Sequence, residues 1–106
     1  MADSVQASHI LLMYQGSSRS TAGRSKDEAL SLINILKSQL HDGGDFAALA
    51  KANSDCPSGN KGGDLGAFGR GQMVPLFEQT AFGLDVGATS DVIETDFGYH
   101  IIQRTK

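Results

Sequence analysis

The chain has 106 residues, the size of one domain, and we expect residues 1–106 to form a single folded unit. Hydrophobic residues make up 40% of the chain and charged residues 20%, a balance typical of globular proteins. The net charge of −3 argues against a general nucleic-acid-binding protein. No run of about 18 apolar residues and no basic, cleavable leader is present, so we expect a cytoplasmic protein without a membrane partner. The single cysteine excludes an internal disulfide and a cysteine-based structural zinc site.

The first element predicted is a strand over residues 5–14, "VQASHILLMY". Under strand alternation one face carries Val5, Ala7, His9, Leu11 and Met13. The opposite face, with Ile10 and Leu12, is apolar as well. A strand that is apolar on both faces is typical of the middle of a sheet. Small polar residues over 15–25 then predict a loop.

Two helices are predicted next. Ser25 and Glu28 fit the capping box S-x-x-E, so a helix should begin near Ser25. Apolar residues then recur at helical spacing, and the helix should end before two glycines, Gly43 and Gly44. Asp45 is placed to cap a second helix over "FAALAKANS". The residues expected to face the core are Ala29, Ile33, Leu36, Leu40, Phe46, Leu49 and Ala50.

The second half predicts a short strand, a helix and a terminal hairpin. "GDLGAFGRG" is the glycine-punctuated strand, and "VPLFEQTAFGL" is a helix with Pro75 in its first turn, ended by Gly83 or Gly87. "SDVIETDFGYHIIQRTK" predicts two short strands joined by a tight turn over 96–98. The fold class is therefore α+β, with a small, mostly antiparallel sheet.

Three residues carry the most evident chemistry: His9, Cys56 and His100. Taken singly, each histidine is most simply a core residue satisfied by a hydrogen bond. Two histidines in the middle of two strands can also meet at the centre of a sheet, if those strands are neighbours. Three functional hypotheses follow: a Cys–His hydrolase, a Cys–His–His metal site, or a non-covalent apolar pocket. The walls of that pocket would be Leu65, Met73, Phe77 and Phe82.

Several motifs in combination resemble the parvulins, a family of peptidyl-prolyl cis/trans isomerases. They are "SHIL", "DFAALAKANSDCPSGNKGGDLGAFGRGQM", "PLFEQTAFGL" and "GYHII", and they span nearly the whole chain. The resemblance implies a four-stranded antiparallel sheet surrounded by three to four helices and no cofactor. It also implies that the substrates are proline-containing segments of proteins, and we expect a monomer that acts on them. The open alternative is a peptide-binding or chaperone-like module with little turnover.

The resemblance also implies a set of site residues. The paired sheet histidines of the family match His9 and His100, and the active-site thiol matches Cys56. A polar position near the second histidine matches Thr95. Where relatives often have a serine two residues further on, this chain has Phe97, so that polar contact is not expected. The proline-binding pocket matches Leu65, Met73 and Phe77.

The loop over 15–26 bears on substrate class, because it carries Arg19, Arg24 and Lys26 and no acidic residue before Asp27. Phosphate-directed parvulins have a long basic loop at this place. Relative to that pattern, Met13 and Ser18 replace two basic residues and Arg19 is retained. The clamp for phosphate is therefore incomplete, and we expect a modest preference for an acidic or phosphorylated residue before proline. No segment here resembles the WW domain that precedes the catalytic domain in some relatives.

Overall fold

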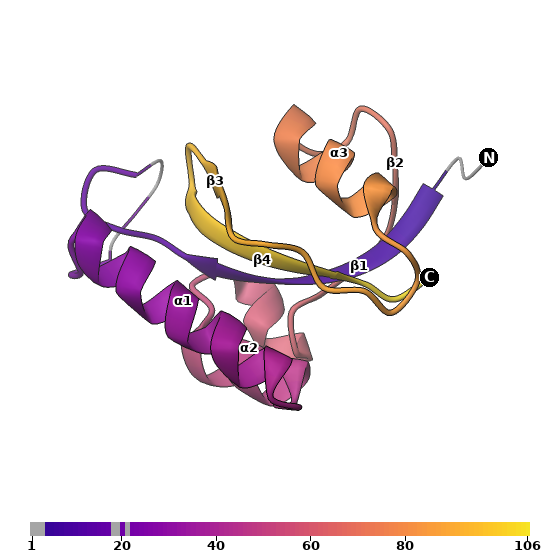
Figure 1. Ribbon diagram of the computed structural model, residues 1–106. Helices are drawn as coiled ribbons and strands as arrows, with labels where there is room; N and C mark the ends of the chain where they lie inside the picture. Colours follow the sequence, from indigo (N-terminus) through magenta and orange to yellow (C-terminus); the bar gives the residue numbers. More distant parts are fainter. Residues whose placement is uncertain (1–3, 18–19, 21) are drawn as a thin grey trace.

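The computed structural model describes residues 4–17, 20 and 22–106. One antiparallel sheet lies at its centre, with strands in the order β2-β1-β4-β3 (Figure 1). Helices α1 and α2 cover one face of this sheet, and α3 lies on the other (Figure 1). The predicted α+β class with four strands is confirmed. The strands are β1 Ser4–Leu12, β2 Asp64–Gly69, β3 Ile93–Thr95 and β4 Gly98–Arg104; the α-helices are α1 Lys26–His41, α2 Phe46–Asn53 and α3 Pro75–Gly83.

The two central strands, β1 and β4, divide the core into two clusters. Alternation sends Ile10 and Leu12 to the face covered by α1 and α2, where they pack with Ile33, Phe46 and Ile101. Val5 and Ala7 of β1 belong to a second cluster on the α3 side, whose other buried members are Phe68, Phe77, Ala81 and Ile102. The prediction of a strand with two apolar faces is confirmed.

The register of the central pair decides where the histidines lie. His9 is opposite Ile102, and Leu11 is opposite His100, in the antiparallel pairing of β1 with β4. His9 and His100 are therefore diagonal neighbours on the same face, the face covered by α3. Both side chains are buried.

Local signals place the helices. The Ser25 hydroxyl accepts from the Glu28 amide and the Glu28 carboxylate accepts from the Ser25 amide, so the predicted capping box is present. Gly43 takes a positive φ of 96° just after α1, which only glycine adopts without strain. Asp45 caps α2, and Pro75 begins α3. Among the residues described, none of the helices combines the length and the apolar composition needed to cross a lipid bilayer.

One element was not predicted: a short 3-10 helix, η1, over Pro57–Lys61. It connects α2 to β2 and is followed by two glycines with positive φ, Gly62 and Gly63. The amide of His9 donates to the carbonyl oxygen of Gly63 at 2.9 Å. A Cβ on Gly63 would collide with the carbonyl oxygen of His9, so glycine is required at this crossing. This close approach brings the segment that carries Cys56 beside β1.

Candidate active site

Six of the predicted site residues meet in one pocket on the α3 side of the sheet. The pocket has a volume of about 450 Å³. Aliphatic, thioether and aromatic side chains make up most of its wall. The six are His9, Cys56, Leu65, Met73, Phe77 and His100, and the remaining lining residues are Leu11, Met13, Pro57, Gln72, Val74 and Phe97.

The floor of the pocket holds a linked pair of imidazoles. The Nδ1 atoms of His9 and His100 lie 3.2 Å apart, and the two rings stack with centroids separated by 5.4 Å. The other nitrogen of His100, Nε2, lies 2.7 Å from the hydroxyl of Thr95. That hydroxyl also accepts a hydrogen bond from the amide of Phe97 at 3.2 Å. Thr95 thus connects the histidine pair to the turn between β3 and β4.

Burial keeps both rings neutral. It lowers the pKa of His9 from its ordinary 6.5 to about 4. The pKa of His100 is lowered to about 3, mainly by burial and further by repulsion from a charged His9. With both rings uncharged, one Nδ1 carries the hydrogen and the other accepts it. At neutral pH the pair is therefore a fixed polar contact rather than a charged group.

The apolar wall is centred on Phe77 from α3. Its ring meets both imidazoles edge to face, with centroid distances of 5.4 Å to His9 and 5.5 Å to His100. Only 3% of Phe77 is exposed, because Phe68 packs behind it at 6.0 Å. Leu65 and Met73 are half-buried and pack against the same cluster. A proline ring is an apolar group of the size that such a slot accepts.

Phe82, which the sequence suggested as a further wall, does not line the pocket. It packs against Phe68 and beneath the guanidinium group of Arg70, which lies 4.3 Å from its ring centroid. The reason is helical geometry. Phe82 lies five residues after Phe77, and five steps of about 100° turn its side chain well away from that of Phe77.

Cys56 lies at the mouth of the pocket, at the position that precedes η1. Its side chain is half-buried, and the Ser58 hydroxyl donates to its sulfur at 3.1 Å. Its amide donates to the Ser54 hydroxyl at 3.4 Å. Within the part of the chain described, the hydrogen-bond partner of the thiol is a serine and not a histidine. A nucleophilic cysteine would instead be expected beside its base.

The basic residues of the loop that the structure describes are already engaged. The guanidinium group of Arg24 pairs with Asp55 and donates to the carbonyl oxygen of Met13 at 3.1 Å. The ammonium group of Lys26 lies 3.0 Å from the carboxylate of Glu94. Arg19, the predicted anion-binding residue, and Ser18 lie outside the described residues.

Six lining residues were not assigned to the site from the sequence, and three of them show which signals were available. Met13 continues the alternation of His9 and Leu11 one residue past the end of β1, so alternation alone was a sufficient signal for it. Phe97 extends the apolar wall at the position where parvulins often have a serine. Gln72, between β2 and α3, gave no signal. Its side-chain oxygen accepts from the amide of Gly69 at 2.8 Å, which helps to shape the turn after β2.

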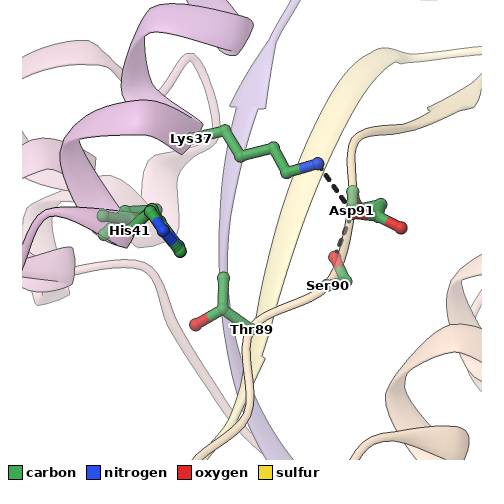
Figure 2. Close-up of a pocket in the computed structure, with 6 residues that line it drawn as sticks. Lys37, His41, Thr89, Ser90 and Asp91 are labelled. Atoms are coloured by element: carbon green, nitrogen blue, oxygen red, sulfur yellow. Dashed lines mark hydrogen bonds and ion pairs between the residues drawn. The ribbon is translucent and has the colours of Figure 1, made fainter.

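A second pocket, of about 420 Å³, lies between the end of α1 and the segment 89–91 (Figure 2). In Figure 2, Lys37 reaches from the helix to Asp91, and the Nζ–Oδ1 distance is 2.6 Å. Ser90 is buried at its edge and donates to the carbonyl oxygen of Asp91 at 2.8 Å. No residue assigned to the site from the sequence lines this pocket, which is polar and charged.

Comparison with known proteins gives concordant matches. A family model described as "PPIC-type PPIASE domain" matches residues 1–106. The chain is 43% identical over 115 residues to "Peptidyl-prolyl cis-trans isomerase Pin1" of Digitalis lanata, with 98% of each chain covered. It is 38% identical to the solved structure "Peptidyl-prolyl isomerase ESS1 from Candida albicans", with a TM-score of 0.91, covering 98% of this chain and 63% of that one. The solution structure of TbPIN1 matches over the whole of both chains, with a TM-score of 0.90 and 32% identity.

Proposed function

The chain belongs to the family of PPIC-type peptidyl-prolyl isomerase domains, the parvulins, and is a peptidyl-prolyl cis/trans isomerase; we propose that it acts by non-covalent stabilisation of a twisted amide. Rotation about an X–Pro bond crosses a barrier of about 18–20 kcal/mol. Resonance is lost at the twisted geometry. An enzyme accelerates the rotation when it binds that geometry more tightly than either planar form. The observation that carries the proposal is the apolar pocket beside Cys56 and the histidine pair.

The proline ring is held by Leu65, Met73 and Phe77. These side chains provide no hydrogen-bond partner for the planar amide, whose dipole is well solvated in water. A twisted amide has a smaller dipole and loses less on leaving water. The apolar wall therefore favours the transition state over both ground states. Phe97 adds to this wall at the mouth of the pocket.

Cys56 has a polar, non-covalent role in this mechanism. Isomerisation breaks no covalent bond, so it requires no acyl-enzyme. Ser58 donates to the sulfur at 3.1 Å, which orients the thiol at the pocket mouth beside the substrate carbonyl. The neutral histidines connect β1 to β4 beneath the site, and the contact of Thr95 with His100 connects β3 to β4. Their lowered pKa values support a structural and tuning role rather than proton transfer near neutral pH.

The proposed substrates are X–Pro segments of proteins, with a modest preference for an acidic or phosphorylated residue before proline. Arg19 is the residue we propose to meet that negative charge. The pairing of Arg24 with Asp55 and of Lys26 with Glu94 supports a modest preference rather than a strict one. We further propose that the protein assists protein folding as a cytoplasmic monomer, without a cofactor or a nucleic-acid or membrane partner; the net charge of −3 is consistent with the absence of nucleic acid.

The decisive test is turnover. Exchange NMR or a protease-coupled assay should detect acceleration of cis/trans exchange in a panel of X–Pro peptides that differ only in the residue before proline. Protein treated with EDTA should be as active as untreated protein. Binding without acceleration would identify a peptide-binding module instead. Loss of activity after EDTA that is restored by zinc, or a covalent adduct of a substrate peptide with Cys56, would contradict the non-covalent mechanism.

A further inference from the structure

The carboxylate of Asp55 is the centre of a small network of hydrogen bonds and one ion pair at the rim of the pocket. The amide of Asp55 donates to the carbonyl oxygen of Leu11 at 2.7 Å, and its Oδ2 accepts from the amide of Met13 at 2.8 Å. The same Oδ2 pairs with the guanidinium group of Arg24, which also donates to the carbonyl oxygen of Met13. Three segments therefore meet at one carboxylate: the end of β1, the loop before α1 and the segment that leads from α2 into η1.

This network lies beside the pocket. Met13 and Cys56 both line the pocket, and Asp55 is bonded to the first of them and precedes the second in the chain. The side chains of Arg24 and Asp55 are each 27% exposed, so the pair is partly shielded from water but open to a bound peptide. Two opposite charges in contact give the rim a net charge near zero at this point. Arg24 is thereby prevented from acting as a free cation.

We propose that Asp55 is a specificity-determining residue that sets the charge of the pocket rim by neutralising Arg24. This inference rests on the isomerase activity and on the acidic preference proposed above. In the native chain, Asp55 keeps the selectivity for an anionic residue before proline low. Removal of its charge releases one positive charge at the rim, and removal of the charge of Arg24 leaves one negative charge there.

The two single substitutions therefore have opposite effects. Asp55→Asn keeps an oxygen for the amide of Met13 but changes the rim charge from about 0 to +1. Arg24→Gln changes it from about 0 to −1, and the double variant restores it to about 0. Each single change should shift selectivity by about threefold. This corresponds to about 0.65 kcal/mol, within the range of about 0–1 kcal/mol expected for a solvent-facing charge pair. Screening at high ionic strength should reduce both shifts.

The measurement is the ratio of kcat/KM for a Glu–Pro peptide to kcat/KM for the matched Ala–Pro peptide, at low and at high salt. Asp55→Asn should raise this ratio about threefold, Arg24→Gln should lower it about threefold, and the double variant should return it to the wild-type value. Asp91→Asn is the matched control. It makes the same change in net charge but opens the Lys37–Asp91 pair on the α1 side (Figure 2), so the ratio should stay at the wild-type value.

Shifts in the same direction for Asp55→Asn and Arg24→Gln, or unchanged ratios in both, would overturn the inference. An equal shift in Asp91→Asn would do so too, because it would reveal an effect of overall charge. Thermal melts identify any variant that fails to fold, in which case the remaining single variant still decides the sign. Turnover of the Ala–Pro peptide by the wild type separates this inference from the proposed function, which fails if no peptide is turned over.

Discussion

The Nδ1 atoms of His9 and His100 lie 3.2 Å apart across the two central strands, although the two residues are 91 positions apart in the sequence. Both rings are buried, and burial is the main cause of their lowered pKa values, about 4 for His9 and about 3 for His100. The Nδ1–Nδ1 hydrogen bond is lost once both rings are protonated, because each Nδ1 then carries a hydrogen and no acceptor remains. The stability of the sheet is therefore linked to pH at the point where the substrate pocket is built.

The first prediction concerns this linkage. An unfolded histidine binds its proton near pH 6.5, whereas the folded pair does not until pH falls to about 4 or 3. The free energy of unfolding should therefore be fully retained above pH 6.5, fall as pH drops from 6.5 towards 4, and level off below the folded pKa values. One unit of pKa difference corresponds to about 1.4 kcal/mol, so the loss by pH 4 amounts to several kcal/mol.

Urea unfolding at closely spaced pH values between 5 and 6.5 checks this prediction, because most carboxylates stay ionised there. The pH slope at the lower end should approach that for uptake of about two protons on unfolding. The control is His41→Gln, which replaces the exposed histidine at the end of α1 and should leave the contribution of the buried pair in place. A free energy of unfolding that stays flat from pH 6.5 to 5 would refute the linkage.

The second prediction compares two phenylalanines of α3. Phe77→Ala opens the slot proposed for the proline ring. It also truncates a buried residue, of which only 3% is exposed. Truncation of a buried phenylalanine costs about 3–5 kcal/mol of stability. Phe82→Ala removes a partly buried ring that does not line the pocket. We expect kcat/KM for Ala–Pro to fall at least about tenfold in Phe77→Ala and to change far less in Phe82→Ala, each assayed well below its Tm.

Equal losses of activity in the two variants would mean that general packing, and not the slot, is responsible. Circular dichroism on the assayed samples provides the required check that each variant is folded. A smaller loss in Phe77→Ala than in Phe82→Ala would contradict the assignment of Phe77 to the pocket.

The third prediction concerns the thiol. Cys56→Ser keeps a small polar group at the mouth of the pocket, within reach of Ser58, and should retain a measurable fraction of the wild-type kcat/KM. A nucleophile would behave differently, because a serine without an adjacent base is a poor one. The measurement is kcat/KM for Ala–Pro on protein whose fold is confirmed by its thermal melt. A folded Cys56→Ser variant with no activity would favour nucleophilic catalysis.

The fourth prediction concerns phosphate. A phosphoserine carries about −1.5 to −2 charge at neutral pH, so it should bind somewhat better than glutamate beside Arg19. Arg24 and Lys26 are paired with Asp55 and Glu94, which limits what the loop can add. We expect phospho-Ser–Pro to exceed Glu–Pro in kcat/KM by well under about a hundredfold, which corresponds to about 2.7 kcal/mol.

The assay uses Ala–Pro, Glu–Pro and phospho-Ser–Pro peptides with the wild type and with Arg19→Ala, at low and at high salt. Arg19→Ala should reduce the preference for the anionic peptides and leave Ala–Pro turnover less affected. A preference of about a hundredfold or more that Arg19→Ala removes would contradict this expectation. It corresponds to about 2.7 kcal/mol, which is more than an incomplete, solvent-facing clamp should provide.

The four strands and the three α-helices were predictable from the sequence because their signals are local. The capping box at Ser25 lies within four consecutive residues, and the alternation of apolar side chains along β1 lies within ten. The resemblance to parvulins then identified six of the twelve residues that line the pocket, since motifs keep residue types at fixed positions. Met13 was also within reach of alternation, because it shares the face of His9.

The relationships between distant segments were decided only by tertiary structure. The short helix η1 has no periodic pattern of its own and is held by the crossing of Gly63 over the backbone of His9. Arg24 and Asp55 are 31 residues apart, so the sequence alone did not indicate that Arg24 is paired. In the folded chain the two side chains form an ion pair without net charge. Composition and local pattern determine which side chains a strand or helix presents. Strand register, backbone crossings and charge pairs depend on which partners folding brings within a few ångströms of each other. Hydrogen bonds and Coulomb interactions depend on the distance between two groups, and only the folded chain sets that distance.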